Sequence, residues 1–264
     1  MTRWAVVSDI HGNLPALQAV LADARAQGTD GLLNLGDIAS GPLWPRETVE
    51  LLMSLPAQTI AGNHERQLLA ADRARMGASD RFAAERLDAA QQGWLAALPT
   101  VMRPEAGLLC LHASPTSDLE NLLETVTPDF GTAGSPGVRE ASAAEVRDRL
   151  ASLAVPEVSL VLCGHTHMPR ARIVDPYHLA NPGSVGLPAF DHDQPFRHHM
   201  QTGSPHARYA IVEREAVGWR IDLRRVDYDW AAAADKAEAE GFGDWADALR
   251  TGRVGRTGSD LPPR

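Results

Sequence analysis

The 264-residue sequence has few cysteines, few aromatic residues, no excess of positive charge and no long apolar run. Its two cysteines, Cys110 and Cys163, both lie within apolar stretches, so we expect buried reduced thiols rather than a disulfide framework. No stretch approaches the roughly 20 apolar residues that cross a bilayer, and the apolar start of the chain is too short for a signal peptide. We therefore expect a cytoplasmic protein with no membrane partner.

The formal net charge is −9 at pH 7, and 44% of the residues are hydrophobic. This composition is ordinary for a globular protein. The negative charge disfavours an extended nucleic-acid-binding surface, which normally needs a positive excess. An acidic protein that handles phosphate groups must supply positive charge locally, and bound metal ions are one way to do so.

The first part of the chain alternates apolar strands with helical patterns. We expect strands at 4–8, 32–35 and 58–61, with helices at about 14–28 and 47–55 between them. This β-α-β-α-β order predicts parallel strands with helices packed on the sheet.

The second part is richer in strands and predicts a second sheet packed on the first. Strands are expected at 108–111, 158–163, 171–174, 209–212 and 219–226, and helices at 79–98, 142–153 and roughly 228–250. A capping box of Ser142 and Glu145 would begin the helix at 142–153. Residues 113–137 predict a long loop or a small insertion over one face, and residues 251–264 a frayed tail. With no clean linker, residues 1–250 are expected to form one domain.

Polar motifs follow directly after five of the predicted strands. They are Asp9-Ile10-His11-Gly12-Asn13, Gly36-Asp37, Gly62-Asn63-His64-Glu65, His112-Ala113-Ser114 and Gly164-His165-Thr166-His167. In an open α/β sheet the carboxyl ends of the strands line one crevice, so these groups should converge. Carboxylates, imidazoles and an amide oxygen are ligands suited to manganese, iron or zinc. Each motif alone could be a turn, a helix cap or a core histidine, but five in this order predict a metal site.

The ordered series resembles that of the calcineurin-like metallophosphoesterases over roughly residues 4–186. The loop at 181–186 also resembles one in the compact prokaryotic branch, whose members are often labelled diadenosine-tetraphosphatase-like or protein-phosphatase-like. Ala113 departs from the pattern, because many members carry glycine after the metal-binding histidine. The resemblance implies an α/β fold, a four-layer α-β-β-α sandwich of two mixed sheets flanked by helices.

Carried over motif by motif, the resemblance implies two divalent metal ions, manganese first, with iron or zinc fitting the same ligands. One ion would be held by Asp9, His11 and His167, the other by Asn63, His112 and His165, and both would be bridged by Asp37. A metal-bridging hydroxide would then attack a phosphate mono- or diester. His64 is expected to be the general acid, oriented by a carboxylate such as Asp9 or Asp37.

Several alternatives stay open for the function. A dinucleoside polyphosphate hydrolase would need a cleft long enough for two nucleoside ends. A non-catalytic scaffold of the same fold is disfavoured because His64 is retained with all seven ligands, and a nuclease is disfavoured by the acidic charge. Glu65 does not belong to a zinc-protease motif, because position 68 is leucine. The expected partner is a small phosphorylated substrate, a nucleotide being one option, and the oligomeric state is not predicted.

Weaker candidates surround these motifs. The arginines considered for a phosphate clamp are Arg46, Arg66 and Arg139, although surface arginines are more often simply solvated. A polar loop at 190–206 is either solvated or part of the cleft rim, and it carries His192, His198, His199 and His206. Ser114 and Ser184 lack the sequence context of a nucleophile elbow.

Overall fold

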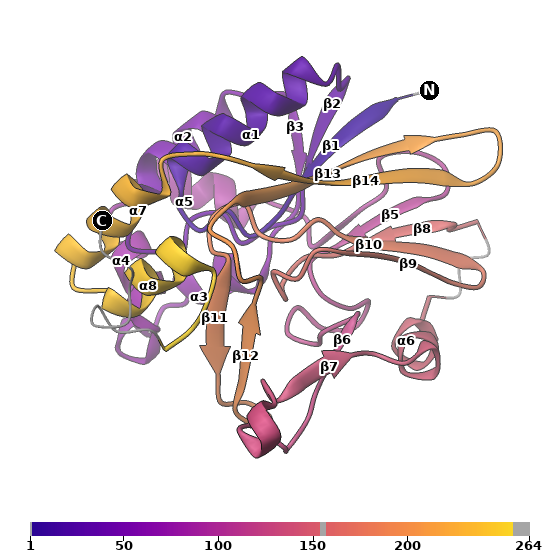
Figure 1. Cartoon of the computed structure of the whole chain (residues 1–264). Helices are drawn as coiled ribbons and strands as arrows, with labels where there is room; N and C mark the ends of the chain where they lie inside the picture. The colour runs from indigo at the N-terminus through magenta and orange to yellow at the C-terminus, as the bar shows by residue number, and fades with distance from the viewer. Residues whose placement is uncertain (1, 154–156, 256–264) are drawn as a thin grey trace.

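Two five-stranded mixed sheets lie face to face in the computed structural model, which describes residues 2–153 and 157–255 (Figure 1). The first sheet contains, in spatial order, β14 (Trp219–Val226), β13 (Ala207–Arg214), β1 (Arg3–Val7), β2 (Gly31–Asn34) and β3 (Ala57–Thr59). The second contains β4 (Val101–Met102), β5 (Leu108–Leu111), β8 (Leu160–Leu162), β10 (Tyr177–Asn181) and β9 (Arg170–Val174). Helices cover the outer faces, so the predicted α-β-β-α sandwich is confirmed.

Each sheet contains three parallel strands, flanked by antiparallel strands on one side of the first sheet and on both sides of the second. Strands β1, β2 and β3 run parallel to one another, as do β5, β8 and β10. Strands β13, β14, β4 and β9 join antiparallel at the sides. Segments that follow the parallel strands therefore leave each sheet at one end, where a site can be assembled from distant parts of the chain.

The alternation of side chains along β1 builds the layers. Ala5 and Val7 pack with helix α1 (Leu14–Ala26) on the outer face of the first sheet. Val6 points the other way and packs with the apolar residues of the second sheet. On the far side, α6 (Ala143–Leu150) covers the second sheet. The predicted capping box of α6 is confirmed, since Glu145 and Ser142 exchange hydrogen bonds.

Two long predicted helices are each broken in two. The predicted helix at 79–98 is α4 (Ala78–Ala84) and α5 (Ala89–Ala96), because the Asp88 side chain accepts from the Gln91 amide and begins a new helix. The predicted helix at 228–250 is α7 (Trp230–Ala239) and α8 (Gly243–Thr251), separated by Gly241 at φ +86°. The predicted tail begins inside α8, and residues 256–264 lie outside the described part of the chain.

Two predicted loops contain short strands. Strand β6 (Glu124–Val126), within 113–137, pairs with β7 (Val138–Glu140). Strands β11 (Ala189–His192) and β12 (His198–Gln201) form a hairpin where a polar loop was predicted. Short polar strands of this kind carry too weak a periodicity to be identified from sequence. The remaining helical elements are α2 (Pro45–Met53), α3 (Asn63–Leu68) and the 3₁₀ turns η1 (Arg73–Arg75) and η2 (Thr132–Gly134).

Two further expectations concern cysteine and the membrane. Cys110 and Cys163 are both buried and free, as predicted. Among the described residues, no helix combines the length and the apolar character needed to cross a bilayer.

Candidate metal centre

The seven predicted ligands gather where the parallel strands end. Asp9 and His11 follow β1, and His165 and His167 follow β8. Asp37 comes after β2, Asn63 begins α3 and His112 comes directly after β5. Six of the seven form two groups whose ligand atoms lie within 4.8 Å of one another: Asp9, His11 and His167, and Asp37, His112 and His165. The structure therefore brings together residues separated by more than 150 positions in sequence.

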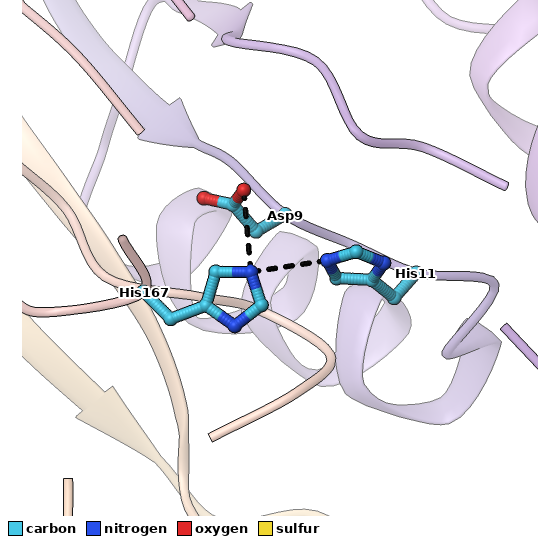
Figure 2. Close-up of side chains that lie close together, drawn as sticks. All are labelled: Asp9, His11 and His167. Atoms are coloured by element: carbon cyan, nitrogen blue, oxygen red, sulfur yellow. Dashed lines mark hydrogen bonds and ion pairs between the residues drawn. The ribbon is translucent and has the colours of Figure 1, made fainter. Parts of the chain in front are cut away.

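Two histidines of the first group face each other through their Nε2 atoms (Figure 2). Nδ1 of His11 donates to the Ser40 carbonyl at 2.7 Å, and Nδ1 of His167 donates to the Leu187 carbonyl at 2.7 Å. Each ring thus turns its Nε2 lone pair inward, and the two Nε2 atoms lie 3.1 Å apart. Asp9 Oδ1 lies 3.4 Å from His167 Nε2. Lone pairs this close repel one another unless a cation or a proton lies among them, so the group fits a metal ion.

The second group has the same character. Nδ1 of His112 donates to the Leu35 carbonyl at 2.8 Å, which leaves Nε2 pointing at Asp37 Oδ2, 3.1 Å away. Asn63 Oδ1 lies 3.1 Å from the same Nε2 and 3.0 Å from His165 Nδ1. With its amide reversed, Asn63 would donate Nδ2 to the carboxylate and the two ring nitrogens, whereas a bound cation would be met by the amide oxygen together with these three atoms. Asn63 thus joins the second group.

Burial and mutual charge shift the pKa values of several of these groups. Burial and the neighbouring His167 lower the pKa of His11 to about 3, and burial with His112 lowers the pKa of His165 to about 4. Burial alone would raise the pKa of Asp37, but the adjacent His112 holds it well below its ordinary value. Burial opposes the charged form of His112, yet Asp37 raises its pKa to about 10. That proton occupies the place a metal ion would take.

The backbone is strained at most of these ligands. Asp9, His11, Asp37, His165 and His167 all adopt positive φ, between 52° and 68°. In the described part of the chain, Ala133 is the sole other non-glycine residue in that region. Such conformations cost on the order of 1–3 kcal/mol each, so the surrounding structure must hold them. Ala113, the departure from the family pattern, is not among them, so alanine fits there.

Glu65 is one of the groups that hold this backbone. Its Oε2 accepts from the amides of Asp37 and Gly62, and its Oε1 accepts from the amide of Ile38, each at 2.8 Å. The side chain is buried and ties the segment after β2 to the start of α3. This role was missed in the sequence, although the spacing of Gly62 and Glu65 at a helix start is that of a capping box.

The end of β10 and the loop after it support two other ligand segments. Ser184 Oγ donates to the Asp9 carbonyl at 2.7 Å, and Asn181 Nδ2 donates to the Gly164 carbonyl at 2.7 Å. At Gly186 a Cβ atom would meet the carbonyl oxygen of Ile10, so glycine permits this close approach. Ser184 is buried in this structural role, in agreement with its exclusion as a nucleophile.

His64 lies beside the two groups and is oriented by Asp80. Its Nδ1 lies 2.7 Å from Asp80 Oδ1, and its backbone amide donates to Asp37 Oδ1 at 2.9 Å. The expectation that Asp9 or Asp37 orients the ring is therefore wrong. Burial disfavours the charged ring, but the carboxylates of Asp37 and Asp80 together raise the pKa of His64 to about 9. Asp80 lies inside α4, where no local motif marks it.

A cavity of about 290 Å³ opens over both groups and is lined by His11, Asp37, Asn63, His64, His165 and His167 among others. A larger cavity of about 620 Å³ adjoins it and shares Gln67, Leu119, His165, Phe190 and His192. A substrate bound over the ligands therefore has room to extend between β6 and the β11–β12 hairpin.

Residues 2–169 match the calcineurin-like phosphoesterase family. The chain belongs to this family. It is 28% identical over 259 residues to an uncharacterised protein of Methanocaldococcus jannaschii, covering 91% of this chain and 94% of the relative. The crystal structure of a metallophosphoesterase from Sphaerobacter thermophilus is similar with a TM-score of 0.70 and 25% identity, covering 95% of this chain and 99% of that one. A hypothetical protein from Pyrococcus horikoshii OT3 shares the fold, with a TM-score of 0.72, 20% identity and coverage of 97% and 100%.

In this calcineurin-like phosphoesterase the three arginines considered for a phosphate clamp are engaged elsewhere. Nη2 of Arg46 lies 3.4 Å from Oδ2 of Asp88, and Nε of Arg66 lies 2.7 Å from Oδ2 of Asp118. Nη2 of Arg139 lies 2.8 Å from Oε1 of Glu145. Among the described residues that line the cavity over the ligands, there is no arginine or lysine. The described lining therefore offers no guanidinium or ammonium group to a phosphate, which leaves histidines such as His64 and bound cations as sources of positive charge.

The four histidines of 190–206 have different surroundings. His192 lines both cavities and His198 lines the larger one, so the rim interpretation holds for these two. His199 packs against Phe130 with ring centroids 4.7 Å apart, and His206 Nε2 lies 3.0 Å from an Asp227 oxygen.

Proposed function

We propose that this phosphoesterase hydrolyses small phosphate mono- or diesters with two divalent metal ions, manganese being the first choice. The observation that carries the proposal is the convergence of lone pairs without a donor, above all the 3.1 Å between the Nε2 atoms of His11 and His167. The lowered pKa values of His11, His165 and Asp37 and the left-handed backbone at five of the residues fit a site that awaits cations.

In this proposal Asp9, His11 and His167 hold one ion, and Asn63, His112 and His165 hold the other. Asp37 is assigned the position between them, because it lies in the second group and its charge also acts on His11 of the first. Two bound divalent ions would supply a nucleophile from water at neutral pH and offset the negative charge of the phosphate.

His64 is proposed as the proton donor to the leaving group. Asp80 can only accept, so Nδ1 of His64 carries a proton and donates to it. The other ring nitrogen, Nε2, remains for the substrate, and His64 lines the cavity over the ligands. With a pKa raised to about 9, the ring is protonated at neutral pH and can release a proton to an alkoxide. Asp80 is a positioning residue in this scheme.

A second candidate is hydrolysis of dinucleoside polyphosphates, which the adjoining cavity favours. Arg149 lines that cavity, and its guanidinium donates to the carbonyls of Leu122 and Glu124 and to the hydroxyl of Thr125. Within the described part of the chain no carboxylate forms an ion pair with Arg149. The cation could therefore face a second phosphate.

Metal analysis followed by a substrate screen with Mn²⁺ tests the proposal. We expect close to two divalent ions per chain and metal-dependent hydrolysis within a panel of mononucleotides, cyclic nucleotides, dinucleoside polyphosphates and phosphopeptides. Preference for dinucleoside polyphosphates would favour the second candidate. Tight metal binding without hydrolysis of any member would point to a scaffold and contradict the proposal.

A further inference from the structure

The cavity over the candidate metal centre is lined by polar and by apolar residues. The polar residues include five of the predicted ligands, His64, and the carboxylates of Asp191 and Asp244. A group of apolar residues, which we call the apolar wall, consists of Leu187, Ala189, Phe190, Trp245, Ala248 and Val254. The wall comes from β11 with the segment leading into it and from α8 with the residues after it (Figure 1). All six residues lie outside the 2–169 stretch that matches the family, so the wall belongs to the C-terminal part of this chain.

Two aromatic rings of the wall stand directly against ligands of the first group. The ring of Trp245 has its centroid 5.8 Å from that of His11, at an interplanar angle of 80°. The ring of Phe190 has its centroid 4.6 Å from that of His167, at 66°. A phosphoester bound to an ion in the first group would therefore place its organic substituent within reach of both rings.

The two aromatic rings of the apolar wall pack against other residues on two sides. Leu187, Ala189 and Ala248 form a buried apolar cluster on which Phe190 and Trp245 pack. On the other side, a Cβ atom at Gly41 would lie 3.0 Å from the Trp245 ring, so the indole packs closely against the backbone of the segment before α2. The indole is therefore packed on two sides, which lowers the entropy cost of ordering it when a ligand binds.

We propose that the apolar wall binds a planar ring of the substrate, so that the preferred substrates are phosphoesters of nucleosides or aryl alcohols. This inference rests on the proposed phosphoesterase function and names its substrate class. A ring covers the apolar wall and pairs edge-to-face or stacked with Trp245 and Phe190, as aromatic rings prefer. A phosphorylated serine or a small alkyl ester would leave most of the wall uncovered. Trp245 is the specificity-determining residue.

Calorimetric titration of the manganese-loaded protein with three phosphonates tests the inference without relying on turnover. The three ligands present the same anionic group. Methylphosphonate carries only a methyl group, butylphosphonate a flexible alkyl chain and phenylphosphonate a planar ring. We expect the wild type to bind phenylphosphonate about tenfold more tightly than methylphosphonate, the effect of one favourable aromatic contact with its buried area. Butylphosphonate binding as tight as phenylphosphonate would overturn the assignment of a planar ring.

Substitutions of tryptophan assign the preference to one side chain. In Trp245→Ala the ratio between phenylphosphonate and methylphosphonate should fall to within about twofold, and Trp245→Phe should retain most of it. Trp230→Ala is the matched control, because Trp230 lies in α7, packs against Tyr228 and His206, and is not among the residues lining the cavity. An unchanged ratio in Trp245→Ala, with methylphosphonate still bound, would overturn the inference.

Failure of the inference differs from failure of the proposed function. If the protein hydrolyses phosphoesters but shows no preference for phenylphosphonate, the wall has no ring-binding role and the inference alone is wrong. If no phosphonate binds and no ester is cleaved, both are wrong. Thermal unfolding of each variant shows whether a lost preference reflects the cavity or a misfolded α8.

Discussion

Nδ1 of His64 lies 2.7 Å from Oδ1 of Asp80, although the first residue is in α3 and the second in α4. The Asp80 side chain is 6% exposed and that of His64 is 26% exposed, so the pair is shielded on the aspartate side and open on the histidine side. A carboxylate placed this way fixes the ring and its tautomer and favours its protonated form.

Asp80→Asn should therefore slow the cleavage of esters with poor leaving groups by about tenfold at neutral pH while leaving metal content unchanged. The Asp80 carboxylate raises the pKa of His64, so its loss lowers that pKa. The protonated ring is then lost at a lower pH, and the alkaline limb of the kcat/KM profile moves to lower pH. Asp72→Asn is the control, since the exposed Asp72 lines an outer pocket that His64 and Asp80 also line. An unshifted alkaline limb in Asp80→Asn would show that the pair does not govern the reaction.

His64→Ala should keep the metal content of the wild type and lose activity according to the leaving group. General acid catalysis contributes about a hundredfold or more for an alkoxide, whereas nitrophenolate leaves with little help. We expect a much larger fall in kcat/KM on alkyl esters than on nitrophenyl esters. Equal losses on both types would contradict the role of His64 as proton donor. His206→Ala, which removes a histidine outside both cavities, should leave both activities intact.

The convergence of the seven proposed ligands could be predicted from the sequence because each lies within a few residues of the end of a predicted strand. A run such as Leu108–Leu111 followed by His112 is a local pattern, and the topology of parallel strands does the rest. Strands β1, β2, β5 and β8 were predicted for the same reason, since burial leaves a continuous apolar run. The central strand β10 was missed, because polar residues such as His178 and Asn181 interrupt its apolar pattern.

Asp80, Phe190 and Trp245 could not be predicted, because tertiary packing alone brings them to the site. Asp80 sat within an expected continuous helix, and the break at Asp88 that separates α4 from α5 was not foreseen. Trp245 reaches His11 because α8 folds back over the cavity, a contact between residues more than 230 positions apart. A hydrogen bond to a backbone carbonyl, such as that from His11 to Ser40, cannot be predicted from the sequence, because every residue carries a backbone carbonyl.

Glu65→Gln should destabilise the fold and the site together. The carboxylate accepts three backbone N–H groups, and an amide replaces one acceptor with a donor that faces a donor. We expect the free energy of unfolding to fall by about 2 kcal/mol, the usual cost of one unsatisfied buried polar group. Denaturant titration measures it, and the exposed Glu85→Gln serves as the matched control. Stability equal to the wild type would mean that the three hydrogen bonds to Glu65 are dispensable.

Metal removal should lower the melting temperature, and Asp37→Asn should abolish most of that response. Without cations the converging lone pairs of the two groups repel one another, so ligation stabilises the folded state alone. At a free metal concentration of about 100 times Kd the gain is about 2.7 kcal/mol, which for a chain of this size corresponds to a rise of about 5–10 °C. The measurement is thermal unfolding in chelator and in increasing Mn²⁺. Asp37 is assigned to both ions, so its amide variant should bind both weakly and lose most activity. Full activity and an undiminished thermal shift in Asp37→Asn would refute the bridging role.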